Sequence, residues 1–165
     1  MSNAEVQQHQ TTARENEKKW SKPVLAAGWS AIPSVLLERQ QALGLSPTDL
    51  NILLQIIRHW WKKDSLPYPS KQTIAECIGI DKRTVQRRIE QLEKDGLIQR
   101  ESRFSASGGG QQSNYYNLSG LVEALKPLAK EAVAEKTQRR AERSARRTRK
   151  GRGVSPATLA KIGPK

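Results

Sequence analysis

Four side chains at the start of one predicted helix could hydrogen-bond to the edges of nucleic-acid bases. They are Lys82, Arg83, Gln86 and Arg87, and at helical spacing they share the outward side of the first two turns. Arginine and lysine match the acceptors of guanine in the major groove, and glutamine matches the donor and acceptor of adenine. We therefore expect these four residues to contact DNA bases.

A second group of side chains could hold the DNA backbone. Basic side chains attract phosphates, while hydroxyls, amides and the free backbone N–H groups at the start of a helix can donate hydrogen bonds to them. The expected backbone contacts are Ser70, Lys71, Gln72, Thr84, Arg88 and Arg103.

Two short helices must position these residues, and they are predicted over residues 71–78 and 82–94. Ser70 is the N-cap of the first helix and Asp81 that of the second, where each side chain can accept a hydrogen bond from a backbone N–H of the first turn. Gly79 permits a tight turn between them. The order is that of a supporting helix followed by a reading helix.

The second helix has an apolar side opposite its basic one. Its apolar residues recur at spacings of four and three, which predicts a single buried stripe: Val85, Ile89 and Leu92. Gly96 ends the helix. A buried stripe would hold the helix rigidly with its basic side outward.

Two further helices are predicted ahead of this pair, over residues 34–41 and 47–62. Ser46 caps the second, and Pro47 takes its first position. The residues expected in the core from this region and from the supporting helix are Leu50, Leu53, Leu54, Ile57, Trp60, Trp61, Ile74, Cys77 and Ile78.

A β-hairpin is predicted after the reading helix. Residues 97–101 and 115–118 are strand-like, and residues 105–113 form a glycine-rich tip. The tip would reach the DNA beside the reading helix through Gly108, Gly109, Gly110 and Gln111. The predicted fold class is therefore mainly α with a small β-hairpin.

Positive charge is concentrated towards the C-terminus. The net charge is +13, and residues 121–165 hold 13 basic and 4 acidic side chains, against 16 and 12 in residues 1–120. A weakly basic body with a strongly basic tail indicates a polyanionic partner, most often a nucleic acid. The tail residues expected to track DNA are Arg139, Arg140, Arg143, Arg146, Arg147 and Arg149.

Composition divides the chain into four regions. We expect a flexible polar arm over 1–27, a folded domain over 28–120, a C-terminal helix over 121–135 and a basic, disordered tail over 136–165. Helical character extends to about residue 149 but is interrupted by Pro127. The part beyond residue 138 lacks an apolar stripe, so it is expected to be largely unfolded.

A homodimer, at least on DNA, is also expected. One reading helix covers few base pairs, and such modules often double their site by two-fold symmetry. The candidate dimer elements are residues 29–43 and 121–134, the latter with Leu121, Leu125 and Leu128 as a partial apolar stripe. The alternative is that this stripe packs on its own domain.

Residues 46–118 resemble the winged helix-turn-helix domains of bacterial and phage regulators. The pattern that carries the resemblance is Ile74-Ala75, then Gly79-Ile80-Asp81-Lys82-Arg83-Thr84-Val85, then Leu92-Glu93-Lys94-Asp95-Gly96-Leu97-Ile98. The resemblance implies base contacts by Lys82, Arg83 and Gln86 and a phosphate contact by Thr84. Residues 29–61 are also similar to the start of phage and plasmid replication proteins that share this domain.

The leading hypothesis is a sequence-specific transcriptional regulator that reads the major groove of double-stranded DNA with helix 82–94. The first alternative is a plasmid or phage replication or partition protein that binds origin DNA. The second is a non-specific nucleic-acid-coating protein dominated by its basic tail. Bound sites would separate them: one operator beside a promoter, repeated sites at an origin, or no preferred sequence.

Other classes of function find no support in the residues. There is no glycine-rich phosphate loop, no Cys/His cluster and no Ser-His-Asp set, so we predict no enzyme, cofactor, metal or small-molecule ligand. The single cysteine excludes an internal disulfide, which is typical of a reducing cytoplasm, and no stretch is apolar enough for a membrane span. We expect a cytoplasmic, nucleoid-associated protein.

Overall fold

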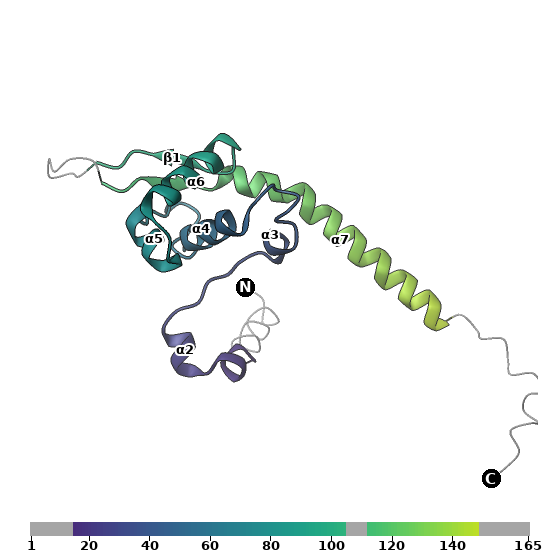
Figure 1. Cartoon of the computed structure of the whole chain (residues 1–165). Coiled ribbons are helices and arrows are strands. Elements are labelled where there is room, and N and C mark those ends of the chain that lie inside the picture. The colour runs from purple at the N-terminus through teal and green to yellow at the C-terminus, as the bar shows by residue number, and fades with distance from the viewer. Residues whose placement is uncertain (1–14, 105–111, 149–165) are drawn as a thin grey trace, which may run out of the picture.

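The computed structural model describes residues 15–104 and 112–148. Figure 1 shows a small helical body from which a β-hairpin and a long helix extend in opposite directions. The helices are α2 (Lys22–Ala26), α3 (Ser34–Glu38), α4 (Pro47–Ile57), α5 (Lys71–Ile78), α6 (Lys82–Lys94) and α7 (Ser119–Thr148), and the strands are β1 (Gln99–Glu101) and β2 (Tyr115–Asn117). The prediction of a mainly α fold with a small β-hairpin is confirmed.

Helices α4, α5 and α6 pack against one another and form the centre of the body. The stripe predicted on α6 is confirmed, because Val85 and Ile89 are fully buried and Leu92 is 1% exposed. Ile52, Leu53 and Ile56 of α4 and Ile74 of α5 belong to the same core.

The caps predicted for these three helices are present. The hydroxyl of Ser46 accepts a hydrogen bond from the backbone N–H of Asp49, and the Asp49 carboxylate accepts one from the backbone N–H of Ser46. The hydroxyl of Ser70 accepts a hydrogen bond from the backbone N–H of Thr73 and caps α5, and the carboxylate of Asp81 accepts one from that of Thr84 and caps α6. Each side chain satisfies an N–H that has no partner inside its helix, which fixes where the helix begins.

Strands β1 and β2 pair antiparallel, with Arg100 opposite Tyr116. Tyr116 is 1% exposed, and its backbone N–H donates to the carbonyl of Pro67 at 2.8 Å. The segment before α5 therefore runs alongside the hairpin and fixes it to the helical body. Burial raises the pKa of the Tyr116 phenol to about 12, so the ring stays neutral.

Helix α7 begins in close contact with the turn that follows α6. The backbone N–H of Leu121 donates to the carbonyl of Leu97 at 2.8 Å. A Cβ atom on Gly120 would lie 1.9 Å from the carbonyl oxygen of Gly96, so only glycine fits there. Leu121 and Leu125 are buried, which anchors the start of α7 in the core.

The prediction of a buried side chain was wrong for two residues, Trp61 and Cys77. Trp61 is 71% exposed, because α4 ends at Ile57 and the chain after it no longer follows the helical period. Cys77 is exposed, and Ala75 takes the inward position on α5. Trp60, in contrast, is half-buried against the core.

Helix α7 also differs from expectation. It continues through Pro127 to Thr148 as a helix of 30 residues, about 45 Å long. Pro127 is exposed, so water can hydrogen-bond to the carbonyl that proline leaves without a partner. Residues 136–148, expected to be unfolded, are helical in the structure. Contacts one turn apart support them, such as Gln138 with Glu142 at 3.1 Å.

The other boundaries shift by a few residues. The helix predicted over 34–41 ends at Glu38, and the one over 47–62 ends at Ile57. Within the polar arm, residues 22–26 form the short helix α2, none of whose residues is buried. In the part of the chain that the structure describes, no helix combines the length and the apolar character needed to cross a bilayer.

Candidate nucleic-acid interface

The four predicted base-contacting residues lie together on the outer side of α6. Lys82, Arg83, Gln86 and Arg87 are all exposed, and with Glu90 they line an open hollow of about 590 Å³. The buried stripe on the opposite side of the helix determines which way they face. The arrangement presents hydrogen-bond donors and acceptors over the N-terminal half of α6.

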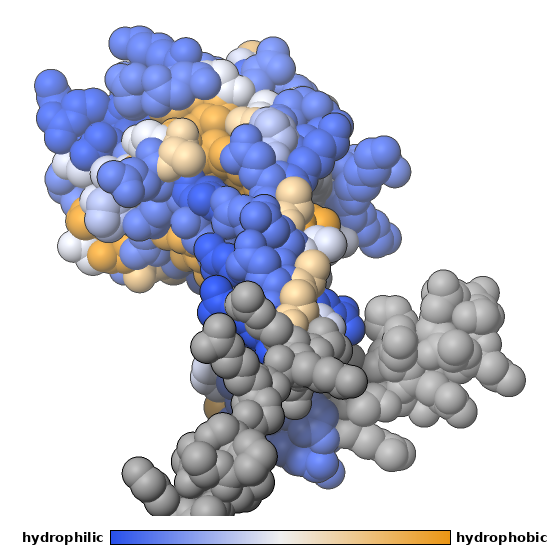
Figure 2. Space-filling model, turned by 90° about the vertical axis from the view of Figure 1, so that its right-hand side faces the viewer, coloured by the Kyte–Doolittle hydropathy of each residue, from blue (hydrophilic) through white to orange (hydrophobic). Residues whose placement is uncertain are grey.

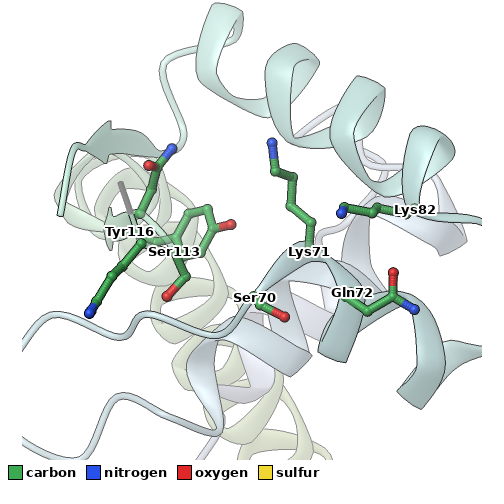
Figure 3. A pocket seen from close by; sticks show the side chains of 8 residues that line it. Ser70, Lys71, Gln72, Lys82, Ser113 and Tyr116 are labelled. Carbon is green, nitrogen blue, oxygen red and sulfur yellow. The ribbon is translucent and has the colours of Figure 1, made fainter. Parts of the chain in front are cut away.

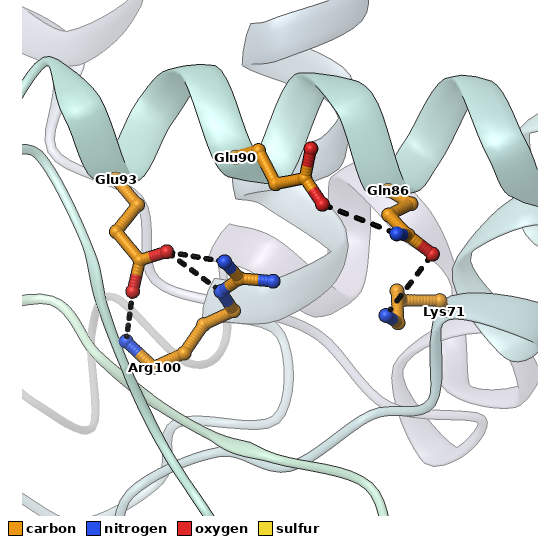
Figure 4. Close-up of polar contacts among 5 residues, drawn as sticks. All are labelled: Lys71, Gln86, Glu90, Glu93 and Arg100. Atoms are coloured by element: carbon orange, nitrogen blue, oxygen red, sulfur yellow. Dashed lines mark hydrogen bonds and ion pairs between the residues drawn. The ribbon is translucent and has the colours of Figure 1, made fainter.

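The Gln86 amide is oriented by its neighbours. Its nitrogen donates to Glu90 at 3.1 Å, and its oxygen accepts from the Lys71 ammonium at 3.4 Å (Figure 4). Both contacts are exposed, so a ligand can replace them at little cost. Glu90 was missed in the sequence, although it follows Gln86 by four residues and must share its side of the helix.

A second hollow, of about 290 Å³, lies between the start of α5 and the hairpin. Three of the predicted backbone contacts, Ser70, Lys71 and Gln72, line it together with Lys82. Figure 3 shows Lys71 and Lys82 on one side of this hollow and Ser113 and Tyr116 on the other. Ammonium groups from two helices thus border the same space.

The hairpin side of this hollow was not anticipated from the sequence. It is lined by Gln112, Ser113, Asn114 and Tyr116. Nothing in the local pattern of residues 112–116 indicates this position, because it depends on the pairing of Tyr116 with Pro67, far apart in the sequence.

Three of the predicted backbone contacts, Thr84, Arg88 and Ser70, hold parts of the fold together through their partners within the chain. The Thr84 hydroxyl donates to the Asp81 carboxylate at 2.6 Å, and hydrogen bonds from Thr84 hold the pKa of Asp81 below its usual value. Arg88 lies 3.7 Å from the buried carboxylate of Asp49 on α4, and the Ser70 hydroxyl caps α5 at 2.9 Å. These interactions fix the two helices, and the role of the three residues towards phosphate stays a prediction.

Arg103 lies at the base of the hairpin beside two aromatic rings. Its guanidinium carbon is 4.3 Å from the centre of the Tyr68 ring and 5.7 Å from that of Tyr115. Cation–π attraction holds the side chain there. The wing residues Gly108, Gly109, Gly110 and Gln111 lie outside the described residues.

The basic residues of the tail are only partly described. Arg139, Arg140, Arg143 and Arg146 are exposed on α7, and Arg139 lies 3.6 Å from Glu135. Arg147 is in the helix, but its side chain lies outside the described part, as does Arg149. The C-terminal part of α7 extends away from the body (Figure 1).

Residues 43–98 match the family described as "Helix-turn-helix domain". The match contains α4, α5 and α6 and ends at Ile98, just before the hairpin. With the hairpin that follows, the fold is that of a winged helix-turn-helix domain, as predicted.

Several solved structures are similar to this chain at low identity. The N-terminal domain of DnaD protein from Geobacillus kaustophilus HTA426 is 22% identical, with a TM-score of 0.49 over 75% of this chain and 96% of that one. A possible transcriptional regulator from Methanosarcina mazei Go1 is 18% identical, with a TM-score of 0.41 over 66% and 85%. A MarR/EmrR family transcriptional regulator from Acinetobacter sp. ADP1 is 17% identical, with a TM-score of 0.37 over 96% and 89%. No curated protein matches the chain.

Proposed function

We propose that this protein is a sequence-specific transcriptional regulator that binds double-stranded DNA with α6 in the major groove. The observation that carries the proposal is the shared outward side of Lys82, Arg83, Gln86 and Arg87 around one hollow. These are the side chains that pair with guanine and adenine edges. In this role the protein binds DNA and catalyses no reaction. It would lie at the nucleoid in the cytoplasm.

The backbone contacts follow from the neighbouring hollow. Lys71 and Lys82 border it from two helices, so a phosphate there would meet two ammonium groups as α6 enters the groove. These contacts would set the register of α6 on the duplex without reading its sequence. Arg103 would add a charge at the base of the wing.

The basic part of α7 would supply a second, non-specific component. Its guanidinium groups are exposed around the helix and far from the reading residues along the chain. Such groups attract phosphates of any sequence and make affinity fall with salt.

Dimeric binding is part of the proposal, but the predicted apolar stripe on α7 does not support it. Leu121 and Leu125 pack in the chain's own core, so they are not offered to a second copy. Seen from the side of α7, the surface carries separate hydrophobic areas within a mainly hydrophilic surround (Figure 2). The reason to expect two copies is the short site that one reading helix covers, and light scattering of the protein free and on DNA measures it.

Selection of bound sequences from a random duplex pool, followed by mapping of bound sites in a genome, tests the function. A regulator yields one preferred sequence, located beside promoters. Repeated copies of that sequence at a replication origin would favour the replication or partition role instead. A pool that shows no enrichment would leave only non-specific coating.

A further inference from the structure

Two exposed aromatic side chains lie at the base of the hairpin, outside the proposed reading surface. Trp61 is 71% exposed and Tyr68 is 48% exposed. Both line an open hollow of about 500 Å³, together with His59, Arg103 and Ser113. Apolar rings left in water beside hydrogen-bonding groups are typical of a site for a flat, partly polar ligand.

The Tyr68 ring is held in place by its neighbours. The rings of Tyr68 and Tyr115 form a T-shaped pair, 5.6 Å between centres and 85° between planes, and the Arg103 guanidinium carbon lies 4.3 Å from the centre of the Tyr68 ring. The Ser113 hydroxyl also donates to the backbone carbonyl of Tyr68 at 2.9 Å. A ring fixed in this way loses little conformational entropy when a ligand stacks beside it.

The aromatic hollow is continuous with the proposed DNA-binding surface. It shares Ser70 and Ser113 with the hollow at the start of α5. That second hollow shares Lys82 with the one on α6. A nucleic acid held on α6 could therefore extend past α5 to Trp61 without leaving the protein surface.

The charge around the aromatic hollow favours a polyanion. Arg103 brings a positive charge to the lining of the hollow. The chain segment that holds both rings, residues 58–73, has four basic side chains and one acidic one, none of which is among the lining residues. Aromatic rings among basic groups form the usual platform for unpaired nucleotides, because every base has a flat face and every nucleotide a phosphate.

We propose that this aromatic hollow binds unpaired bases of single-stranded DNA that adjoins the duplex on α6, with the indole of Trp61 as the main stacking surface and Tyr68 as the second. The phosphates of the unpaired strand then lie near Arg103. The site gives the protein a preference for duplexes with a melted or single-stranded flank. This inference rests on the proposed function, since the duplex on α6 places the strand.

The test uses the full chain and two labelled oligonucleotides of about eight nucleotides, measured by fluorescence anisotropy at one salt concentration. One is oligothymidine, and the other has the same phosphates but abasic sugars. Because both carry the same charge, their affinity ratio reports the contacts made to the bases, and the Trp61 variants report the share that is due to stacking. The variants are Trp61→Ala, Trp61→Phe and, as a matched control, Trp29→Ala, which removes a tryptophan that is 60% exposed elsewhere.

We expect the wild-type protein to bind oligothymidine roughly 5- to 100-fold more tightly than the abasic strand. Trp61→Ala should lower this ratio several-fold, leaving only the contribution of Tyr68, while Trp61→Phe and Trp29→Ala keep most of it. Equal affinity of the wild type for both strands, or equal losses in Trp61→Ala and Trp29→Ala, would overturn the inference. In either case the hollow would have to serve another partner, such as a protein.

A duplex measurement separates this inference from the proposed function. The wild type and all three variants should keep their preference for a selected duplex over a random one. If the protein prefers its selected duplex but binds oligothymidine and the abasic strand equally well, the aromatic site is contradicted and the proposed function stands. Absence of any duplex preference would contradict the proposed function.

Discussion

Arg100 of β1 is joined to Glu93 of α6 by a set of charged hydrogen bonds. The guanidinium donates twice to one carboxylate oxygen, with the Nε bond at 2.8 Å, and the backbone N–H of Arg100 donates to the other oxygen at 3.1 Å (Figure 4). The contact fastens the C-terminal end of α6 to strand β1 and so couples the direction of the helix to the position of the hairpin.

Glu93→Gln should reduce stability and change its pH dependence. Hydrogen bonds from the Arg100 side chain hold the pKa of Glu93 below its usual value. The carboxylate thus contributes stability that is present above the unfolded-state pKa and is lost as the pH falls through the lowered folded-state pKa. We expect the free energy of unfolding at neutral pH to fall by roughly 1–2 kcal/mol.

Denaturant melts at several pH values measure this effect. The decline in stability below about pH 5 should be shallower in Glu93→Gln than in the wild type. Glu101→Gln, an exposed position on the same hairpin, is the control and should follow the wild type. A wild-type profile for Glu93→Gln would mean that the contact is not made in solution.

Gly120→Ala should destabilise the domain, although alanine is the better helix former. Propensity alone would favour alanine by up to about 1 kcal/mol. The added Cβ, however, would lie 1.9 Å from the Gly96 carbonyl oxygen, so we expect a net loss of roughly 1–3 kcal/mol. Thermal melts give the sign, with Lys130→Ala on the exposed side of α7 as the control. A stabilised Gly120→Ala protein would show that α7 does not begin against this turn.

Val85→Asp should unfold the domain. The Val85 side chain is fully buried, and an unpaired carboxylate there costs several kcal/mol. Gln86→Asp places the same charge on the exposed side of α6 and should melt close to the wild type. Circular dichroism distinguishes the two, and a wild-type melt for Val85→Asp would mean that Val85 does not face the core.

Replacing Arg139, Arg140, Arg143 and Arg146 by glutamine should weaken binding to all DNA sequences by a similar factor. These residues are exposed on α7. For every phosphate that is no longer neutralised, the decrease of log affinity with log salt should become shallower by about 0.9. Deletion of residues 136–165 should have a larger effect in the same direction and leave the preferred sequence unchanged. An unchanged salt slope would assign this part of the chain to another partner.

The sequence predicts the helix-turn-helix well because its determinants are local. Ser46, Ser70 and Asp81 fix the helix starts through their own side chains, and the stripe of Val85, Ile89 and Leu92 follows the period of one helix. The grouping of Lys82, Arg83, Gln86 and Arg87 follows from the same period. These features need no knowledge of distant residues.

The features that the sequence did not predict depend on contacts between distant segments. The exposure of Trp61 follows from the early end of α4, and the hollow beside α5 depends on Tyr116 reaching Pro67. Past Pro127, α7 contacts a distant segment through Glu135, whose carboxylate pairs with Arg39 at 2.8 Å. Periodicity cannot show that a helix is anchored elsewhere, which is why the distal part was expected to be unfolded.

The most direct test of the account compares selected and random duplexes for Arg83→Ala and Gln86→Ala. Each variant should lose roughly 1–3 kcal/mol of binding to the selected duplex and almost none to the random one. Lys94→Ala, at the other end of the same helix, serves as the control and should not change the preference. Equal losses on the two duplexes would contradict the central claim that the outward side of α6 reads the DNA sequence.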